Sequence, residues 1–145
     1  MIRKADSDDY KRITGLALLL WPGHRPDDLE KEIARILKGD NSAFFLAYDK
    51  EQPVGFAQCQ LRNDYVEGTC SSPVGYLEGI FVKEECRRRG FARQLLAYCE
   101  VWSKDMGCTE FASDCELSNE DSLYFHKRLG FKEVNRIICF TKKIE

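Results

Sequence analysis

The segment "GIFVKEECRRRGFARQLL", residues 79–96, joins three kinds of sequence in one order. An apolar, strand-like stretch comes first, a cluster of arginines follows, and the residues after Gly90 have the apolar spacing of an amphipathic helix. The N-terminus of a helix exposes unpaired N–H groups and the positive end of the helix dipole. Glycine lets the backbone approach a ligand, and arginines add positive charge. The segment therefore predicts a strand–loop–helix unit whose loop suits a pyrophosphate, although these residues also fit a solvated basic turn.

The segments around residues 79–96 predict an α/β (α+β) fold. Before it we expect a strand at 2–5, helices over 6–20 and 27–38, and strands at 43–49, 53–62 and 75–82. After it we expect a helix over 90–106, a strand in 108–115, a helix in 118–130 and a last strand in 131–143. Hairpins first and strand–helix–strand units later indicate a mixed, mostly antiparallel sheet with helices on both faces.

Composition limits the classes of function. The chain has 145 residues and 43% hydrophobic content, so we expect one domain over residues 1–145. The net charge of −2 argues against a nucleic-acid binder, so an anion site must be local. The polar N-terminus does not resemble a signal peptide, and no apolar run reaches membrane length. We therefore expect a cytoplasmic protein with no membrane or nucleic-acid partner.

The seven cysteines do not indicate a disulfide framework. Their number is odd, and several lie in apolar, element-like segments, so we interpret them as reduced core thiols. No two have C-x-x-C spacing, and the only histidines are His24 and His126. We therefore expect no metal site.

A known family shares the pattern of the opening segment. Arg87-x-x-Gly90-x-Ala92, after a strand and at the start of a helix, resembles the coenzyme A pyrophosphate loop of the GNAT acyltransferases. The later "SNEDSLYFHKRLGF", residues 118–131, resembles the N-x-x-[AS]…G-F segment of that family. Together the two similarities cover residues 75–131 in the family's order.

The resemblance implies a GNAT fold in which two splayed central strands hold acetyl-CoA. The pantetheine would lie along the strand Gly79–Val82, and a backbone N–H near Ile80 or Phe81 would polarise the thioester carbonyl. An amine would then attack directly in a ternary complex, with coenzyme A leaving. The implied cofactor-binding residues are Ile80, Phe81, Val82, Arg87, Arg88, Arg89, Gly90, Phe91, Ala92, Arg93, Asn119 and His126.

Strings outside the cofactor loop resemble a narrower group. "LWPGH" (20–24), "NDYVEG" (63–68), "SSPVGYLEGIF" (71–81) and "ASD" (112–114) are together similar to one branch of the bacterial aminoglycoside 6′-N-acetyltransferases. The similarity implies transfer of acetyl to the 6′-amino group of aminoglycosides, which confers antibiotic resistance. The substrate-binding residues that we expect are Trp21, Tyr65, Glu78, Asp114 and Asn135.

The residue chemistry agrees with a polycationic acceptor. Glu78 precedes the cofactor-contacting strand segment and Asp114 ends the next strand, with Asp64, Glu67 and Glu116 in nearby loops. An amine attacks only as the free base, whereas alkylammonium groups have a pKa near ~10.4, so some group must receive the proton, and a carboxylate can do so. We expect Asp114 and Glu78 to be the catalytic residues, with water between carboxylate and amine or without it. Each acid alternatively fits a structural salt bridge.

Two aromatic positions also have two interpretations. Trp21 fits either a wall of the acceptor site or a plug of the hydrophobic core. His126 stands where many GNAT members have a tyrosine that protonates the leaving thiolate. Either His126 takes that role, or solvent does.

Other functions and the oligomeric state are also open to the sequence. The same scaffold fits an acetyltransferase for a polyamine or an amino sugar, or a non-catalytic acyl-CoA-binding module. The last expected strand includes "NRIICFTKK", residues 135–143, which is too apolar for an open edge. Since relatives of this type dimerise through their C-terminal strands, the resemblance implies a homodimer.

Overall fold

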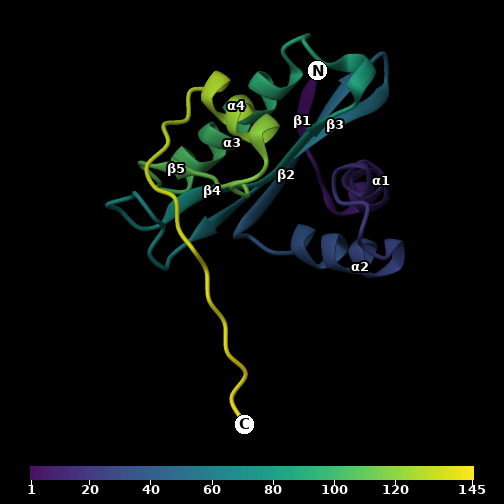
Figure 1. Cartoon of the computed structure of the whole chain (residues 1–145). Coiled ribbons are helices and arrows are strands. Elements are labelled where there is room, and N and C mark those ends of the chain that lie inside the picture. The colour runs from purple at the N-terminus through teal and green to yellow at the C-terminus, as the bar shows by residue number, and fades with distance from the viewer.

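A five-stranded sheet in the order β1-β2-β3-β4-β5 organises the chain (Figure 1). The computed structural model describes all 145 residues. None of its helices has the length and apolar character needed to cross a membrane. The elements are β1 (Ile2–Lys4), the 3-10 helix η1 (Ser7–Asp9), α1 (Tyr10–Leu20), α2 (Pro26–Leu37), β2 (Ser42–Asp49), β3 (Gln52–Arg62), β4 (Val74–Val82), the 3-10 helix η2 (Glu84–Cys86), α3 (Phe91–Asp105), β5 (Phe111–Ala112) and α4 (Glu120–Arg128).

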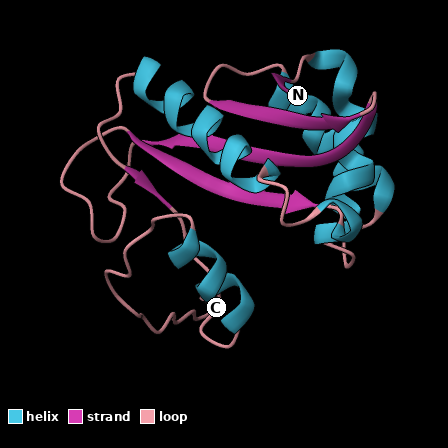
Figure 2. Ribbon diagram, turned by 90° about the horizontal axis from the view of Figure 1, so that it is seen from above, coloured by secondary structure: helices cyan, strands magenta, loops and turns pink.

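The sheet is mixed, as predicted. Strands β1 to β4 pair antiparallel in succession, whereas β5 runs parallel to β4. The β4–β5 pairing consists of Gly75 with Phe111 and Tyr76 with Ala112, and it stops there. Figure 2 shows β5 as a short strand beside one end of β4. The rest of β4 therefore has a strand partner on one edge only, which is the predicted splay of the central strands.

Helices cover both faces of the sheet because β2 and β3 are apolar on both faces. In β2, Phe44 packs with the residues of α1 and α2, whereas the adjacent Phe45 packs with those of α3. Successive strand residues point to opposite faces, so these two neighbours lie in two different cores. Ile13, Leu16 and Ile33 lie in the first core, and Leu77, Leu95 and Cys99 lie in the second.

The predicted strand at 131–143 is wrong for the single chain. Residues 131–145 contain no strand, and Figure 1 shows this yellow segment running away from the body of the molecule. The prediction for 108–115 was also too long, because only Phe111 and Ala112 form a strand. Since β5 offers so short an edge, one chain gives the C-terminal segment no long strand to pair with. Phe140 is consequently 88% exposed, which contradicts the expectation that this segment is covered.

The prediction of reduced core thiols holds for four of the seven free cysteines. Cys59, Cys86, Cys99 and Cys108 are buried. The other three, Cys70, Cys115 and Cys139, are exposed because they lie in loops or in the C-terminal segment, so the prediction was wrong for them.

A buried carboxylate ties the N-terminal strand to the first helix. The Asp9 side chain is only 2% exposed and accepts two hydrogen bonds of 2.7 Å from the guanidinium of Arg3. Arg12 donates a third bond at 3.0 Å, and the backbone N–H of Asp6 donates a fourth at 2.9 Å. A buried charge with this many donors is strongly held, because charge-assisted bonds replace the lost hydration.

We expect the protein to lose stability as the pH falls through the titration of Asp9. The hydrogen bonds from Arg3 lower the pKa of Asp9 to about 2, below its ordinary value of 3.8. Because the folded pKa is the lower one, the stabilisation is complete above pH ~4 and is lost between pH ~4 and ~2, with a total of about 2 kcal/mol. Urea unfolding at a series of acidic pH values measures it. An Asp9→Asn variant should show a shallower slope, and equal slopes would contradict the assignment.

Candidate functional site

The loop between β4 and α3 presents a row of unpaired backbone donors. The N–H groups of residues 88–93 make no hydrogen bond within the chain, and α3 begins directly after Gly90. Gly90 has a φ of +85°, which favours glycine, and a Cβ there would meet nothing closer than the Gln94 side chain at 3.7 Å. The first turn of a long helix with free N–H groups is an anion site. The loop thus has the free N–H groups and the helix N-terminus that the predicted anion site requires.

The arginines around this loop differ in how they are held. Arg87 donates to the carbonyl at the end of β4 at 2.8 Å, and Arg89 donates to Asp49 Oδ2 at 2.8 Å. Arg93 donates to a carbonyl at the end of α4 at 2.9 Å. Arg88 is exposed and forms no ion pair. Arg87, Arg89 and Arg93 therefore brace the loop, and Arg88 is the one whose guanidinium has no partner in the chain.

The open edge of β4 lies next to this loop. Residues 79–81 pair with β3 on one side, as Gln58 with Gly79, Ala57 with Ile80 and Phe56 with Phe81. On the other side no strand follows once β5 has ended. An extended ligand can take that place and hydrogen-bond to β4 as a further strand would. The predicted cofactor-binding stretch Ile80–Val82 is therefore at a suitable edge.

Asn119 and His126 have structural partners on α4. The Asn119 side chain caps the helix by accepting from Ser122 N at 3.1 Å. His126 Nδ1 lies 2.7 Å from the Ser122 carbonyl oxygen, and His126 Nε2 lies 2.7 Å from Ser113 Oγ. Because a carbonyl oxygen only accepts, Nδ1 donates to Ser122, and the Ser113 hydroxyl occupies Nε2. Both ring nitrogens of His126 thus have hydrogen-bond partners within the chain.

Trp21 and Glu78 share a cavity of about 190 Å³ between α1, α2 and the sheet. The edge of the Trp21 ring lies against Gly79, where a Cβ would come within 2.6 Å of Trp21 Cζ2. The ring also meets Phe56 edge-on at 6.0 Å, so Trp21 is both a core residue and a cavity wall. The residues lining the cavity are Trp21, His24, Leu29, Glu32, Ile33, Ile36, Gln58 and Glu78.

Two predicted carboxylates are joined through two residues that the sequence analysis missed. Glu78 Oε1 accepts from Arg62 Nη2 at 2.8 Å, so the alternative of a salt bridge is realised. The Arg62 guanidinium lies 3.5 Å from the centre of the Tyr76 ring, and the Tyr76 hydroxyl donates to Asp114. Tyr76 and Glu78 are two residues apart on one strand, so they share a face of the sheet. That spacing is the signal that points to Tyr76 from the sequence.

Tyr65 and Asn135 lie elsewhere. Tyr65 is 76% exposed, and its hydroxyl accepts from Gly68 N at 3.3 Å. Asn135 donates to Glu67 Oε1 at 2.7 Å, which ties the start of the C-terminal segment to the same loop. No hydrogen bond joins either residue to the two predicted catalytic carboxylates. The single chain thus brings Trp21 and Glu78 together, whereas Tyr65 and Asn135 lie apart from them.

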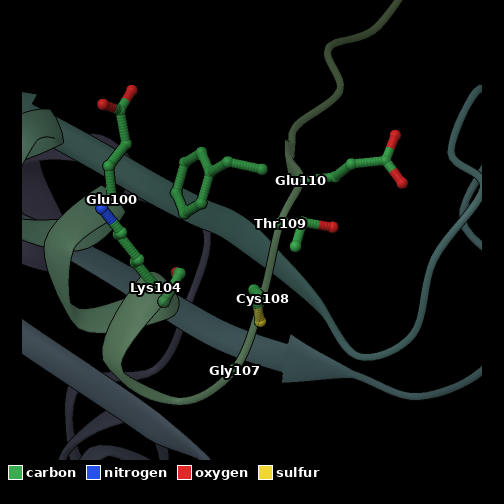
Figure 3. Close-up of a pocket in the computed structure, with 8 residues that line it drawn as sticks. Glu100, Lys104, Gly107, Cys108, Thr109 and Glu110 are labelled. Atoms are coloured by element: carbon green, nitrogen blue, oxygen red, sulfur yellow. The ribbon is translucent and has the colours of Figure 1, made fainter.

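A larger cavity, of about 520 Å³, contains none of the predicted site residues. Figure 3 shows Glu100 and Lys104 of α3 on one side of it and Thr109 and Glu110 before β5 on the other. Its lining also includes Ser103, Gly107, Cys108 and Phe111. This cavity reaches β5 through Phe111. No group of three His, Cys, Asp or Glu side chains in the structure could hold a metal ion.

Comparisons with known proteins point to one family. Residues 10–131 match the family described as "Acetyltransferase (GNAT) family". The Serratia marcescens protein named "Aminoglycoside N(6')-acetyltransferase type 1" is 39% identical over 145 residues, covering 99% of each chain. A protein of the same name from Salmonella enteritidis is 41% identical over 142 residues, covering 98% of each chain.

Solved structures agree. A structure of aminoglycoside N-acetyltransferase AAC(6')-Iy in complex with CoA has a TM-score of 0.95 and 40% identity, covering 99% of this chain and 95% of that one. AAC(6')-Iy in complex with the bisubstrate analogue CoA-S-monomethyl-acetylneamine has a TM-score of 0.94 and 40% identity, covering 99% and 98%. This likeness covers the anion loop, the open edge of β4 and the cavity at Trp21.

Proposed function

Since the chain belongs to the GNAT family of acetyltransferases, we propose that it transfers the acetyl group of acetyl-CoA to the 6′-amino group of aminoglycoside antibiotics. The observation that carries the proposal is the similarity, over nearly the whole chain, to aminoglycoside N(6')-acetyltransferases. We propose that residues 1–145 form one acetyltransferase domain, that it acts in the cytoplasm, where acetyl-CoA is made, and that it confers resistance.

The loop and the open strand edge fit acetyl-CoA. In our proposal the N–H groups of residues 88–93 hold the pyrophosphate, and Arg88 adds a positive charge. The pantetheine extends along the open edge of β4. A backbone N–H at Ile80 or Phe81 then polarises the thioester carbonyl and stabilises the oxyanion that forms on attack.

The carboxylates serve the acceptor. An aminoglycoside enters with its 6′ nitrogen as an ammonium, which must lose a proton before it attacks. We propose that Asp114 receives this proton, directly or through one water. Glu78 faces the cavity beside Trp21, where its carboxylate binds a second ammonium group and the indole covers a sugar face. We propose that Tyr65 and Asn135 contact a part of the drug that extends out of this cavity toward their loop.

Solvent protonates the leaving thiolate in this proposal. Hydrogen bonds within the chain occupy both ring nitrogens of His126, and the Tyr124 side chain is 62% exposed on α4. Coenzyme A thiolate is a tolerable leaving group, so catalysis does not require a side-chain acid. His126 instead joins α4 to the end of β5.

Thiol release from acetyl-CoA tests the activity. Kanamycin, which carries a 6′ amine, should give turnover well above that with spermidine or glucosamine. Even, weak turnover over all these amines would instead favour a general small-amine acetyltransferase. Tight acetyl-CoA binding without turnover would favour a non-catalytic acyl-CoA-binding module.

We also propose a homodimer that is built through the C-terminal segment. Ile137, Ile138 and Phe140 lie within four successive residues and are 65%, 81% and 88% exposed in the single chain, which is unusual for an apolar run. The short β5 pairs with β4 only and leaves an open sheet edge, and the cavity of about 520 Å³ is lined by Phe111 of this strand. A segment from a second copy fits that edge as an added strand.

The double substitution Ile138→Gln/Phe140→Gln should convert the dimer to a monomer. In an added strand these two side chains, two residues apart, would share one face, so the change removes the exposed apolar surface that the partner would bury. Light scattering coupled to size-exclusion chromatography measures the mass. Leu19→Gln, an exposed leucine on α1, is the matched control and should leave the mass unchanged. A dimer that survives the double substitution would contradict this interface.

A further inference from the structure

The side chains of four residues form a continuous network of contacts: Glu78, Arg62, Tyr76 and Asp114. Glu78 bonds Arg62, Arg62 stacks on Tyr76, and Tyr76 bonds Asp114. Arg62 ends β3, Tyr76 and Glu78 belong to β4, and Asp114 follows β5. This network of side chains thus links three neighbouring strands at the place where β4 and β5 separate.

The hydroxyl of Tyr76 is a fixed donor to Asp114. Tyr76 is only 6% exposed, and burial followed by the hydrogen bond to Asp114 raises the pKa of its phenol. The phenol therefore stays protonated at neutral pH and keeps donating. Asp114 itself is exposed, two residues after a strand of two residues, and no other hydrogen bond holds its carboxylate. Without Tyr76 this side chain would sample several rotamers.

Arg62 holds Glu78, at the other end of this network of contacts. Its Nη2 and Nε donate to the same oxygen of Glu78, Oε1, at 2.8 and 3.2 Å, so Oε2 remains open. The flat guanidinium lies on the Tyr76 ring while it donates both hydrogen bonds to Glu78. A lysine ammonium could not make both contacts in this way. Arg62 thereby fixes the direction of Glu78 Oε2, and it packs against the Tyr76 ring, whose hydroxyl donates to Asp114.

We propose that Arg62 and Tyr76 are positioning residues that hold Glu78 and Asp114 as one rigid acceptor unit. The inference rests on the proposed function, because it assigns the task of the two residues in aminoglycoside acetylation. One carboxylate oxygen on each acid is left for the drug, and the distance between the two ammonium groups that they accept is set by the Arg62–Tyr76 stack. Drugs whose amines match that spacing are turned over fastest.

Steady-state kinetics of Tyr76→Phe and Arg62→Met in the full chain test the proposal, with kanamycin as the drug. Each variant should lower kcat by about 10-fold, because the acid that the residue held is no longer kept in the productive orientation. KM for acetyl-CoA should stay within about twofold, because the loop at 88–93 is untouched. The double variant should be little worse than either single one, because the two residues act as a unit.

Matched variants make the result specific. Tyr98→Phe on α3, a half-exposed tyrosine away from the acceptor, should leave kcat unchanged. Arg62→Lys keeps the charge but not the flat fork, and it should be as slow as Arg62→Met. An Arg62→Lys variant with full kcat would overturn the role of the stack.

The outcomes separate this inference from the proposed function. Absence of turnover in the unchanged enzyme would overturn the proposed function and this inference with it. Normal turnover in the unchanged enzyme together with an unchanged kcat in Tyr76→Phe would overturn the inference alone. So would a loss of kcat in Tyr76→Phe that merely follows the fraction of folded protein, as measured by thermal unfolding.

Discussion

Replacing Asp114 by asparagine should reduce kcat with a 6′-amine aminoglycoside by about 10²-fold or more, the range for loss of a general base. Asparagine keeps the size of the side chain and can still accept from the Tyr76 hydroxyl through its amide oxygen. It has no basic oxygen that could take the proton of the attacking amine. KM for acetyl-CoA should change little, since the anion loop is formed by other residues.

The pH dependence of the residual activity sharpens this test. If Asp114 is the base, the activity of Asp114→Asn should rise with pH toward the pKa of the drug amine, because more amine is then already free. Asp105→Asn, an exposed aspartate at the end of α3, is the matched control and should behave like the unchanged enzyme. A kcat for Asp114→Asn within a few-fold of normal would remove Asp114 from the proton transfer.

Replacing Asp9 by alanine should cost the fold about 3 kcal/mol, the low end for breaking a buried ion pair. The substitution leaves the guanidinium of Arg3, which is only one-third exposed, without its two charge-assisted bonds. It also removes the acceptor for the backbone N–H of Asp6 at the start of η1. The midpoint of thermal unfolding should fall by about 10 °C for a chain of this length.

The neighbouring acid provides the control for this prediction. Asp8 belongs to the same short helix but is exposed and makes no ion pair, so Asp8→Ala should move the midpoint by less than about 2 °C. Equal effects of the two substitutions would mean that the hydrogen bonds of Asp9 are not what stabilises this end of the chain.

Local sequence signals were sufficient for most of the fold. The hairpin of β2 and β3 follows from two apolar runs separated by a short polar turn, and α3 follows from apolar spacing that ends near Gly107. The C-terminal strand was predicted wrongly because a strand needs a neighbour, and that neighbour depends on distant residues. An apolar pattern shows that residues 131–143 must be covered, but not by which chain.

The site was predictable in its backbone parts and less so in its side-chain contacts. Gly90 and the helix after it follow from residue type and order alone. The pairing of Arg62 with Glu78 depends on the β3–β4 register, which shifts at an irregularity between Gln58 and Cys59. Residue types do not indicate such a shift, so the side-chain contacts that link Glu78 to Asp114 could be identified only from the structure.

Acetylation of two paired aminoglycosides, one with a 6′ amine and one with a 6′ hydroxyl, tests the central claim most directly. Thiol release from acetyl-CoA is followed for both drugs, and the product is examined by NMR for the acetylated position. We predict rapid release with the 6′-amine drug, acetylation at that nitrogen, and no release with the 6′-hydroxyl analogue. Equal release with both drugs would place the reacting amine elsewhere on the antibiotic and contradict the proposed function.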